Sequence, residues 1–244
     1  STFKIFTVAQ ALELGLVDPK TKINTKGPIR MGGHKINDYR SNGPELPVWE
    51  IITESSNLGT ARIAKMIGPE KQREFLSSLG FSKPTTIEMI EANGGKPLLP
   101  KRWNELETMT ISYGHGLSAT PLHLATGYAT LANGGRLVNP TLLQEVKPVL
   151  GPRVISKEVA ENSLAMLRGV VTGGTASLAD VDGYFVGGKT GTADKPSSQG
   201  GYDKEKNIAN FASIFPINEP KYVLVVTLDE AQDTSGPEPK RTAG

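Results

Sequence analysis

The sequence predicts an α+β fold in which a helical lobe precedes a small antiparallel sheet. Two observations predict it. Up to about residue 172, apolar residues recur at helical spacing in segments that end at glycine, asparagine or proline. Beyond residue 181, aliphatic and aromatic runs alternate with polar turns, which is typical of strands. We therefore expect one domain over residues 1–244, with a helical lobe over about 1–172 and a sheet portion over about 181–232.

Helical spacing and end signals place the individual helices. Pro69 opens one helix, Thr120 and Pro121 open another, and Gly15 and Gly80 stand where helices end. The expected helices cover residues 3–12, 48–54, 58–67, 69–79, 122–131 and 156–171. Residues 18–45 are rich in Gly, Pro, Asn and Lys, so we expect a long polar connection there, of the kind that borders clefts.

Three segments of the C-terminal part are expected strands. They cover residues 185–192, 208–215 and 222–228, each rich in aliphatic or aromatic side chains. The polar run over residues 195–207 is expected to be a solvated hairpin loop.

The composition excludes several classes of protein. Lys and Arg number 27 against 25 for Asp and Glu, and this net charge of +2 is far from that of nucleic-acid-binding proteins. Cysteine is absent, which excludes thiol nucleophiles and cysteine metal sites. The three histidines have no metal-ligand spacing, and a Ser-His-Asp triad through His115 is disfavoured. We expect no nucleic-acid partner, no metal and no cofactor.

Three short motifs carry residues suited to acyl transfer. Ser1 and Lys4 lie in the first turn of the opening helix, Ser55–Asn57 connects two helices, and Lys189–Thr192 lies on the first expected strand. Each motif alone is weak, because such residues often serve only as helix caps or strand ends. Their order and structural settings together favour a joint catalytic role.

The residue types suggest how the motifs would share the chemistry. A serine hydroxyl becomes a nucleophile when a base removes its proton, and Lys4 lies on the same helix face as Ser1. Burial, or a second cation such as Lys189, would depress the pKa of Lys4 so that it can act as that base. Ser55 would pass the proton to the leaving amine, and Asn57 would hold Lys4 and the substrate amide in place.

The strand motif and the middle serine are candidates for substrate binding. Lys189 supplies positive charge, and Thr190 and Thr192 supply hydroxyls for a substrate carboxylate. Gly191 lets a substrate backbone approach closely, and the Thr192 N–H is a candidate oxyanion donor. Ser56 is a further candidate for substrate contact.

These motifs resemble those of the transpeptidase domain of penicillin-binding proteins and their β-lactamase relatives. The likeness extends to Ser112–Leu117 and Thr120–Leu122, which look most like the cell-division (septal) type of class B. The resemblance implies the penicillin-binding-protein/β-lactamase-like fold, with helices around a five-stranded sheet. In this family, two strands of the sheet and a helix normally precede the nucleophile, and a helix closes the domain at its C-terminal end. We therefore expect a domain truncated at both ends, with three strands.

The resemblance also implies a function. It implies a D,D-transpeptidase in which Ser1 attacks the D-Ala-D-Ala end of a peptidoglycan stem peptide, and in which β-lactams acylate the same serine. It further implies divisome membrane proteins and a septal glycosyltransferase as partners. The implied location is the periplasmic face of the bacterial inner membrane, with an N-terminal anchor absent from this chain.

Three alternatives stay open. An elongation-type class B transpeptidase would share the active site and differ in its partners. A non-catalytic β-lactam sensor would be acylated without turnover, and a structural member of a division complex would not be acylated at all. A β-lactamase of class A needs a Glu followed four residues later by Asn for its deacylating water. We expect no such pair in this chain, which favours a slow-deacylating transpeptidase or carboxypeptidase.

Overall fold

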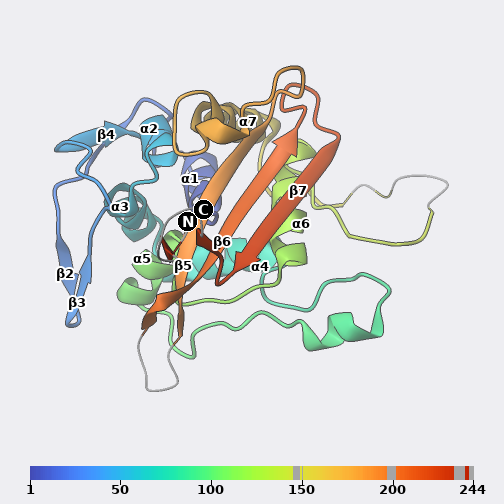
Figure 1. The fold of residues 1–244 in the computed structure, drawn as a ribbon, viewed down its shortest axis with the longest axis horizontal. Helices are drawn as coiled ribbons and strands as arrows, with labels where there is room; N and C mark the ends of the chain where they lie inside the picture. Colours follow the sequence, from blue (N-terminus) through green and yellow to red (C-terminus); the bar gives the residue numbers. More distant parts are fainter. Residues whose placement is uncertain (145–148, 150, 197–201, 234–239, 242–244) are drawn as a thin grey trace.

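In a computed structural model of the chain, residues 1–144, 149, 151–196, 202–233 and 240–241 are described. Figure 1 shows a three-stranded sheet in front of a group of helices, with small hairpins at one side. The helices are α1 (Lys4–Glu13), α2 (Val48–Thr53), α3 (Asn57–Ile67), α4 (Pro69–Ser78), α5 (Glu105–Ser112), α6 (Pro121–Ala132) and α7 (Lys157–Thr172), with 3-10 turns η1 (Ile90–Gly94) and η2 (Ser177–Ala179). The strands are β1 (Lys22–Asn24), β2 (Ile29–Met31), β3 (His34–Ile36), β4 (Glu45–Pro47), β5 (Gly187–Pro196), β6 (Tyr202–Phe215), β7 (Tyr222–Asp229), β8 (Gln232–Asp233) and β9 (Lys240–Arg241).

The expected helices form, and their ends follow local chemistry. Thr120 caps α6 by accepting the His123 N–H, and Pro121 occupies its first position. Ser156 caps α7 in the same way, by accepting the Val159 N–H. Helix α5 was not expected, although Asn104 and Glu107 form a reciprocal capping box at its start.

The main sheet is antiparallel, in the order β5-β6-β7. Lys189 of β5 lies opposite Ala212 of β6. Strand β5 begins two residues later than expected because Phe185 has a φ of 49°, outside the strand region. The expected loop over residues 195–207 is wrong at its ends, since Lys195 and Pro196 pair with Asp203 and Tyr202 beyond a register shift. Residues 197–201 of that run lie outside the described residues.

The polar connection over residues 18–45 is more regular than expected. It contains β1, β2 and β3 and the start of β4, in two antiparallel pairs: β1 pairs with β4, and β2 and β3 form a hairpin between them in the chain. Each of these strands has three residues and at most one buried side chain, so the alternation is too short to stand out in the sequence.

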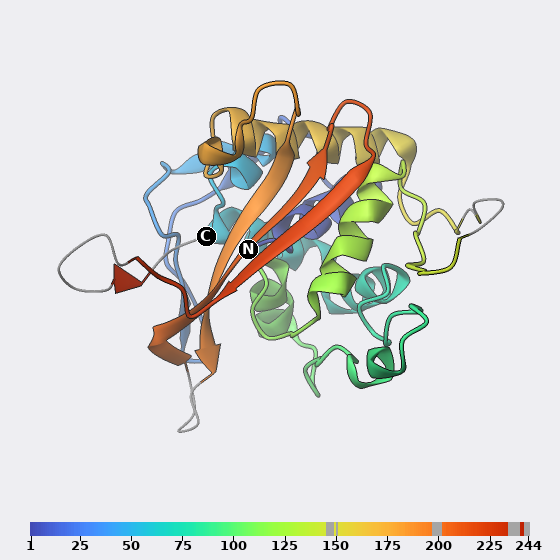
Figure 2. The same cartoon turned by 45° about the vertical axis from the view of Figure 1, so that its right-hand side comes forward.

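Helix α1 forms the centre of the core. All of its residues from Lys4 to Ala11 are buried. Around it, Phe6 packs its ring against Phe3, Phe81 and Tyr128, with ring centroids 5.4 to 5.7 Å apart. Figure 2 shows α7 running across one end of the sheet strands and α6 alongside β7. A helix held on every side gives the residues at its N-terminus a fixed position.

None of the helices in the described part of the chain is long and apolar enough to cross a membrane.

Candidate active site

The amine of Lys4 joins the first two sequence motifs. Its Nζ lies 3.2 Å from the Ser1 Oγ and 2.8 Å from the Ser55 Oγ. It also donates to the Ser55 backbone oxygen at 2.6 Å. Helix α1 begins at Lys4, so Ser1 lies in the turn before it and not inside the helix, and the Lys4 N–H donates to the Ser1 carbonyl. Side chains 51 residues apart in the sequence therefore meet at one buried amine.

The third motif reaches the same serine. Lys189 Nζ donates to the Ser55 Oγ at 2.9 Å and to the Thr190 carbonyl at 3.1 Å. The Lys4 and Lys189 side chains are 1% and 0% exposed, so both amines are removed from water. The Ser55 hydroxyl thus lies between two buried lysines.

This environment changes the pKa of both amines. Burial lowers the pKa of Lys4 well below its ordinary value, the Lys189 charge lowers it further, and the Asp38 carboxylate partly opposes the change. Burial also lowers the pKa of Lys189 to about 7. A neutral Lys4 has the lone pair that a general base requires, while Lys189 keeps part of its charge near neutral pH.

The backbone at Ser55 is strained, and hydrogen bonds to helix α2 hold it in place. Ser55 has a φ of 58°, in the left-handed region that side chains other than glycine seldom adopt. Such a residue persists only where its surroundings fix it, at a cost of roughly 1–3 kcal/mol. The Ser55 and Ser56 N–H groups donate to the carbonyls of Ile52 and Ile51 at 3.2 and 2.9 Å, which closes the turn after α2.

Ser56 and Asn57 have structural contacts where substrate contacts were expected. Ser56 is 0% exposed; its Oγ accepts the Gly59 N–H as the cap of α3 and donates to Asp38. Its hydroxyl is engaged by these two contacts within the fold, and we reassign it to support of the corner at Ser55. Asn57 Nδ2 donates to the Asn37 carbonyl at 2.9 Å, whereas the Lys4 amine bonds to Ser1 and Ser55. The expected contact between Asn57 and Lys4 is therefore replaced by one between Asn57 and the loop after β3.

The remaining residues of the strand motif pass beside Ser1 or contact helix α7's C-terminal loop. A Cβ on Gly191 would lie 3.2 Å from the Thr2 Cγ2, so β5 runs close to the turn that carries Ser1. The Thr190 Oγ1 lies 3.1 Å from the Thr175 Oγ1. Strand β5 is an outer strand of the β5-β6-β7 sheet, with Thr192 paired to Ala209 on its inner side. Among the described strands, none pairs with the other side of β5.

Sequence reasoning missed two residues that contact the site. Asp38 lies in a segment without periodicity, and no local pattern links it to Ser56, 18 residues away. Thr175 follows Gly173 and Gly174 at the end of α7, where the sequence signals only a helix end. Both are brought to the site by tertiary packing.

His115 and His123 differ in their surroundings. His123 is buried, with ring nitrogens 2.7 Å from the Thr120 Oγ1 and 2.8 Å from the Lys83 carbonyl, which is a packing role. Burial lowers the pKa of His115 to about 4, the nearby positive charges lower it further, and Asp194 opposes them. Among the described residues, no three His, Asp or Glu side chains gather as a metal site requires.

The expectation that the chain has no Glu-x-x-x-Asn pair was wrong, because one occurs at Glu158 and Asn162. It lies in the first turns of α7, and the N–H of the α7 cap, Ser156, donates to Glu13 at the far end of α1. Helix α1 has ten residues, a length of about 15 Å, so the pair lies about that far from Ser1. The pair is too far away to activate a water at Ser1.

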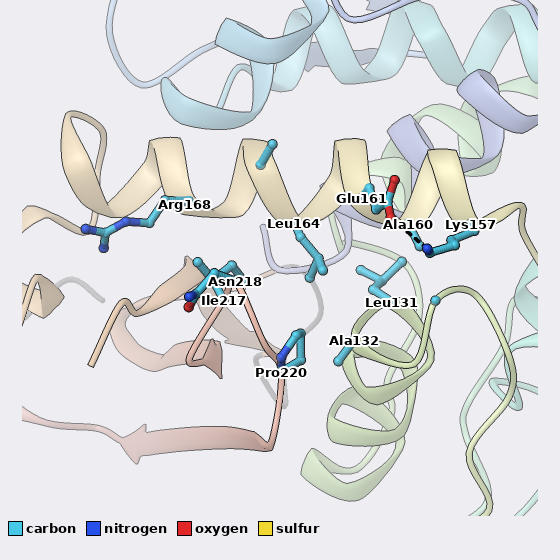
Figure 3. A pocket seen from close by; sticks show the side chains of 12 residues that line it. Leu131, Ala132, Lys157, Ala160, Glu161, Leu164, Arg168, Ile217, Asn218 and Pro220 are labelled. Carbon is cyan, nitrogen blue, oxygen red and sulfur yellow. Dashed lines mark ion pairs between the residues drawn. The ribbon is translucent and has the colours of Figure 1, made fainter. Parts of the chain in front are cut away.

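A groove of about 510 Å³ lies away from these motifs, between the end of α6, helix α7 and the β6–β7 turn (Figure 3). Its walls are mostly apolar, with Lys157 and Arg168 toward its ends. None of the three motifs contributes to it, and we assign it no part in the chemistry.

Comparison with known proteins fits this arrangement. The family model described as the penicillin binding protein transpeptidase domain matches residues 1–243. The chain belongs to this family. The transpeptidase domain is 34% identical over 242 residues to a probable peptidoglycan D,D-transpeptidase FtsI of Caulobacter vibrioides, covering 94% of this chain and 40% of the relative. It is 33% identical to FtsI of Escherichia coli K12, covering 95% and 39%, so it spans about two fifths of these relatives.

Solved structures confirm the predicted fold of this transpeptidase domain. The apo transpeptidase domain of Burkholderia pseudomallei penicillin-binding protein 3 superposes with a TM-score of 0.87 at 36% identity, covering 94% of this chain and 70% of that one. Penicillin-binding protein 3 of Mycobacterium tuberculosis in complex with aztreonam gives a TM-score of 0.84 at 29% identity, covering 94% and 55%. The predicted class B membership agrees with the FtsI relatives.

Proposed function

We propose that this domain is a peptidoglycan D,D-transpeptidase that works by serine acyl transfer. The observation that carries the proposal is the buried Lys4 amine, within hydrogen-bond distance of both the Ser1 and the Ser55 hydroxyls. A lysine with a depressed pKa, beside one serine that attacks and another that relays, can serve both halves of an acyl transfer. The relatives named as peptidoglycan D,D-transpeptidases support the substrate class.

The first half-reaction forms an acyl-enzyme. Neutral Lys4 takes the proton of Ser1 as the Ser1 Oγ attacks the carbonyl between the two terminal D-Ala residues. The Ser55 hydroxyl gives its proton to the departing D-Ala amine and is reprotonated from Lys4, 2.8 Å away. The C–N bond breaks, D-Ala leaves, and the acyl group stays on Ser1 as an ester.

The second half-reaction returns the enzyme to its starting state. An amine of a neighbouring stem peptide attacks the ester, its proton passes to the Ser1 Oγ by way of Ser55 and Lys4, and a cross-link results. In the first half-reaction, Lys189 and the Thr190 and Thr192 hydroxyls hold the carboxylate of the terminal D-Ala along β5 until that residue leaves, with Gly191 giving the substrate backbone room.

We infer that β-lactams acylate Ser1 by the same route. One relative, penicillin-binding protein 3 of Mycobacterium tuberculosis, has been solved in complex with aztreonam and in complex with ampicillin, which supports this inference. For the biological role we favour septal cross-linking, with divisome proteins and a septal glycosyltransferase as partners at the periplasmic face of the inner membrane. A relative named stage V sporulation protein D, 32% identical, is the observation that keeps other class B roles as second candidates.

The test uses the complete protein with a donor peptide ending in D-Ala-D-Ala and an acceptor peptide with a free amine. Release of D-Ala together with cross-linked product, both lost in Ser1→Ala, is the expected result. Acylation by benzylpenicillin without any peptide turnover would identify a sensor instead. Absence of both reactions in a folded protein would identify a scaffold.

A further inference from the structure

Two neighbouring residues of α7 contact the segments that carry Ser55 and Lys189. A Cβ on Gly169 would lie 3.0 Å from the Thr53 Cγ2, so helix α7 packs directly on the end of α2, two residues before Ser55. The backbone N of Arg168 lies 3.2 Å from the position of a Cβ on Gly187, the first residue of β5 and two residues before Lys189. Helix α7 therefore serves as the common support of both segments.

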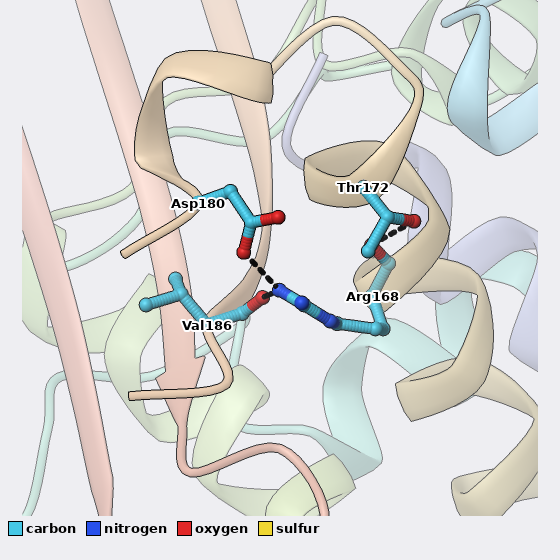
Figure 4. Close-up of polar contacts among 4 residues, drawn as sticks. All are labelled: Arg168, Thr172, Asp180 and Val186. Atoms are coloured by element: carbon cyan, nitrogen blue, oxygen red, sulfur yellow. Dashed lines mark hydrogen bonds and ion pairs between the residues drawn. The ribbon is translucent and has the colours of Figure 1, made fainter. Parts of the chain in front are cut away.

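The Arg168 side chain adds a direct bond to the start of β5. Its guanidinium donates to the Val186 carbonyl at 2.7 Å and to the Asp180 carboxylate at 2.8 Å (Figure 4). Val186 immediately precedes β5. The neighbouring carbonyl, that of Phe185, accepts the Ile217 N–H at 2.8 Å. Both carbonyls just before β5 thus accept a hydrogen bond, and the one of Val186 accepts it from the Arg168 side chain.

The bond to Val186 matters more than the ion pair beside it. Asp180 is 43% exposed, and exposed ion pairs contribute little to stability because water screens them. The Arg168 side chain is 27% exposed, and its bond to the Val186 carbonyl is partly buried. A charged donor to a partly buried carbonyl is among the stronger hydrogen bonds of a protein.

We propose that Arg168 is a positioning residue of the acyl transfer, which fixes the start of β5 on α7 and thereby the distance between the Lys189 amine and the Ser55 hydroxyl. This inference rests on the function proposed above. The relevant separation is 2.9 Å, and Lys189 is only about 7 Å along the strand from Gly187. A displacement of the start of β5 should therefore move the Lys189 amine by a similar distance.

The test is the kinetics of acylation of the complete protein by a chromogenic penicillin, measured for Arg168→Met, Arg168→Lys and Asp180→Asn. Met keeps the length and the apolar stem of Arg but donates nothing. We expect Arg168→Met to lower the acylation rate constant about 10-fold, since misplacing a group by about 1 Å can cost up to about 100-fold. The dissociation constant of the noncovalent complex should change less than about twofold, because the substrate contacts remain.

The two other variants separate positioning from stability. Arg168→Lys keeps one donor and should recover part of the rate, whereas Asp180→Asn keeps the bond to Val186 and should acylate like the parent. A parent-like acylation rate constant in Arg168→Met, whatever its melting temperature, overturns the inference. If Arg168→Met does not fold, equal rate constants in Arg168→Lys and Asp180→Asn overturn it instead. A parent protein that is not acylated fails the proposed function, which is a different result.

Discussion

Asp38 and Ser56 are joined by a hydrogen bond of 2.7 Å, in which the Ser56 hydroxyl donates to the carboxylate. The same carboxylate accepts the Leu58 N–H at 2.9 Å, so it caps α3 alongside Ser56. This pair ties the loop after β3 to the corner that carries Ser55. It also places a negative charge near Lys4, where it raises the lysine pKa against the larger effect of burial.

Replacing Asp38 by Asn should slow acylation and change its pH dependence. Without the charge, the pKa of Lys4 falls further, so the acidic limb of the acylation rate should move to lower pH. The loosened Ser55 corner should lower the maximal rate about 10-fold. The measurement is acylation by benzylpenicillin across pH, with Asp18→Asn as a control, since Asp18 also accepts two backbone N–H groups but in an exposed turn. An acidic limb that stays in place would contradict the electrostatic part of this account.

Replacing Lys4 by Ala should nearly abolish acylation. A positioned general base contributes about 10² to 10⁴-fold, and Lys4 also orders Ser55. The pH profile of the residual acylation rate should then lack the acidic limb that titration of Lys4 causes. Stopped-flow measurement of penicillin adduct formation across pH would check both expectations. Lys65→Ala is a suitable control, because Lys65 forms an exposed ion pair with Glu105. A loss of less than about 10-fold in Lys4→Ala would assign the base to another group.

The Lys189 pKa of about 7 predicts a change in substrate affinity near neutral pH. Below pH 7 the amine is charged and attracts a carboxylate, and above pH 7 that charge is lost. The noncovalent dissociation constant of a carboxylate-bearing substrate should therefore rise as the pH increases from 6 to 8. An affinity independent of pH over this range would show that Lys189 does not titrate there.

Removing the buried Lys189 charge should stabilise the fold. The folded-state pKa lies below that of an unfolded lysine, so the unfolded chain binds more protons between pH 7 and about 10.4, and burial of this amine costs stability that is regained as the pH rises. Lys189→Met should raise the melting temperature at pH 7 by roughly 2–4 °C, with a smaller gain near pH 10. Calorimetry at both pH values is the measurement, and a lowered melting temperature at pH 7 would contradict it.

Thr175→Val should weaken binding of the substrate carboxylate. The Thr175 hydroxyl lies 3.1 Å from the Thr190 hydroxyl, and either can donate to the other. When Thr175 donates, the Thr190 proton is available to the ligand. Loss of one such bond should raise the noncovalent dissociation constant about 3- to 10-fold while the acylation rate constant changes less. Thr172→Val is the matched control, because the Thr172 hydroxyl donates only within α7, to the Arg168 carbonyl. Equal dissociation constants in the two variants would refute the role of Thr175.

The sequence was most informative where a feature is local. Thr120 with Pro121, and Ser156 before an apolar run, mark helix starts through the residue types that the first turn needs. The capping box of Asn104 and Glu107 was an available signal of the same kind for α5. The three-residue strands of residues 22–47 gave no usable period, because one buried side chain defines no alternation.

The site divides in the same way. Ser1, Lys4, Ser55 and Lys189 could be named because their residue types and spacing suit acyl transfer, and the structure brings their side chains together. The contacts of Asn57 and the burial of Ser56 could not be predicted, since they depend on the loop that carries Asp38. Packing between distant segments decides which polar side chains meet at Lys4 and which support the corner.

The most direct test of a Ser1 nucleophile activated by Lys4 is the mass of the intact protein before and after incubation with benzylpenicillin, followed by peptide mapping. The account predicts one adduct on the peptide that contains Ser1, no adduct in Ser1→Ala, and a greatly slowed adduct in Lys4→Ala. An adduct on another residue, or one that persists in Ser1→Ala, would contradict it.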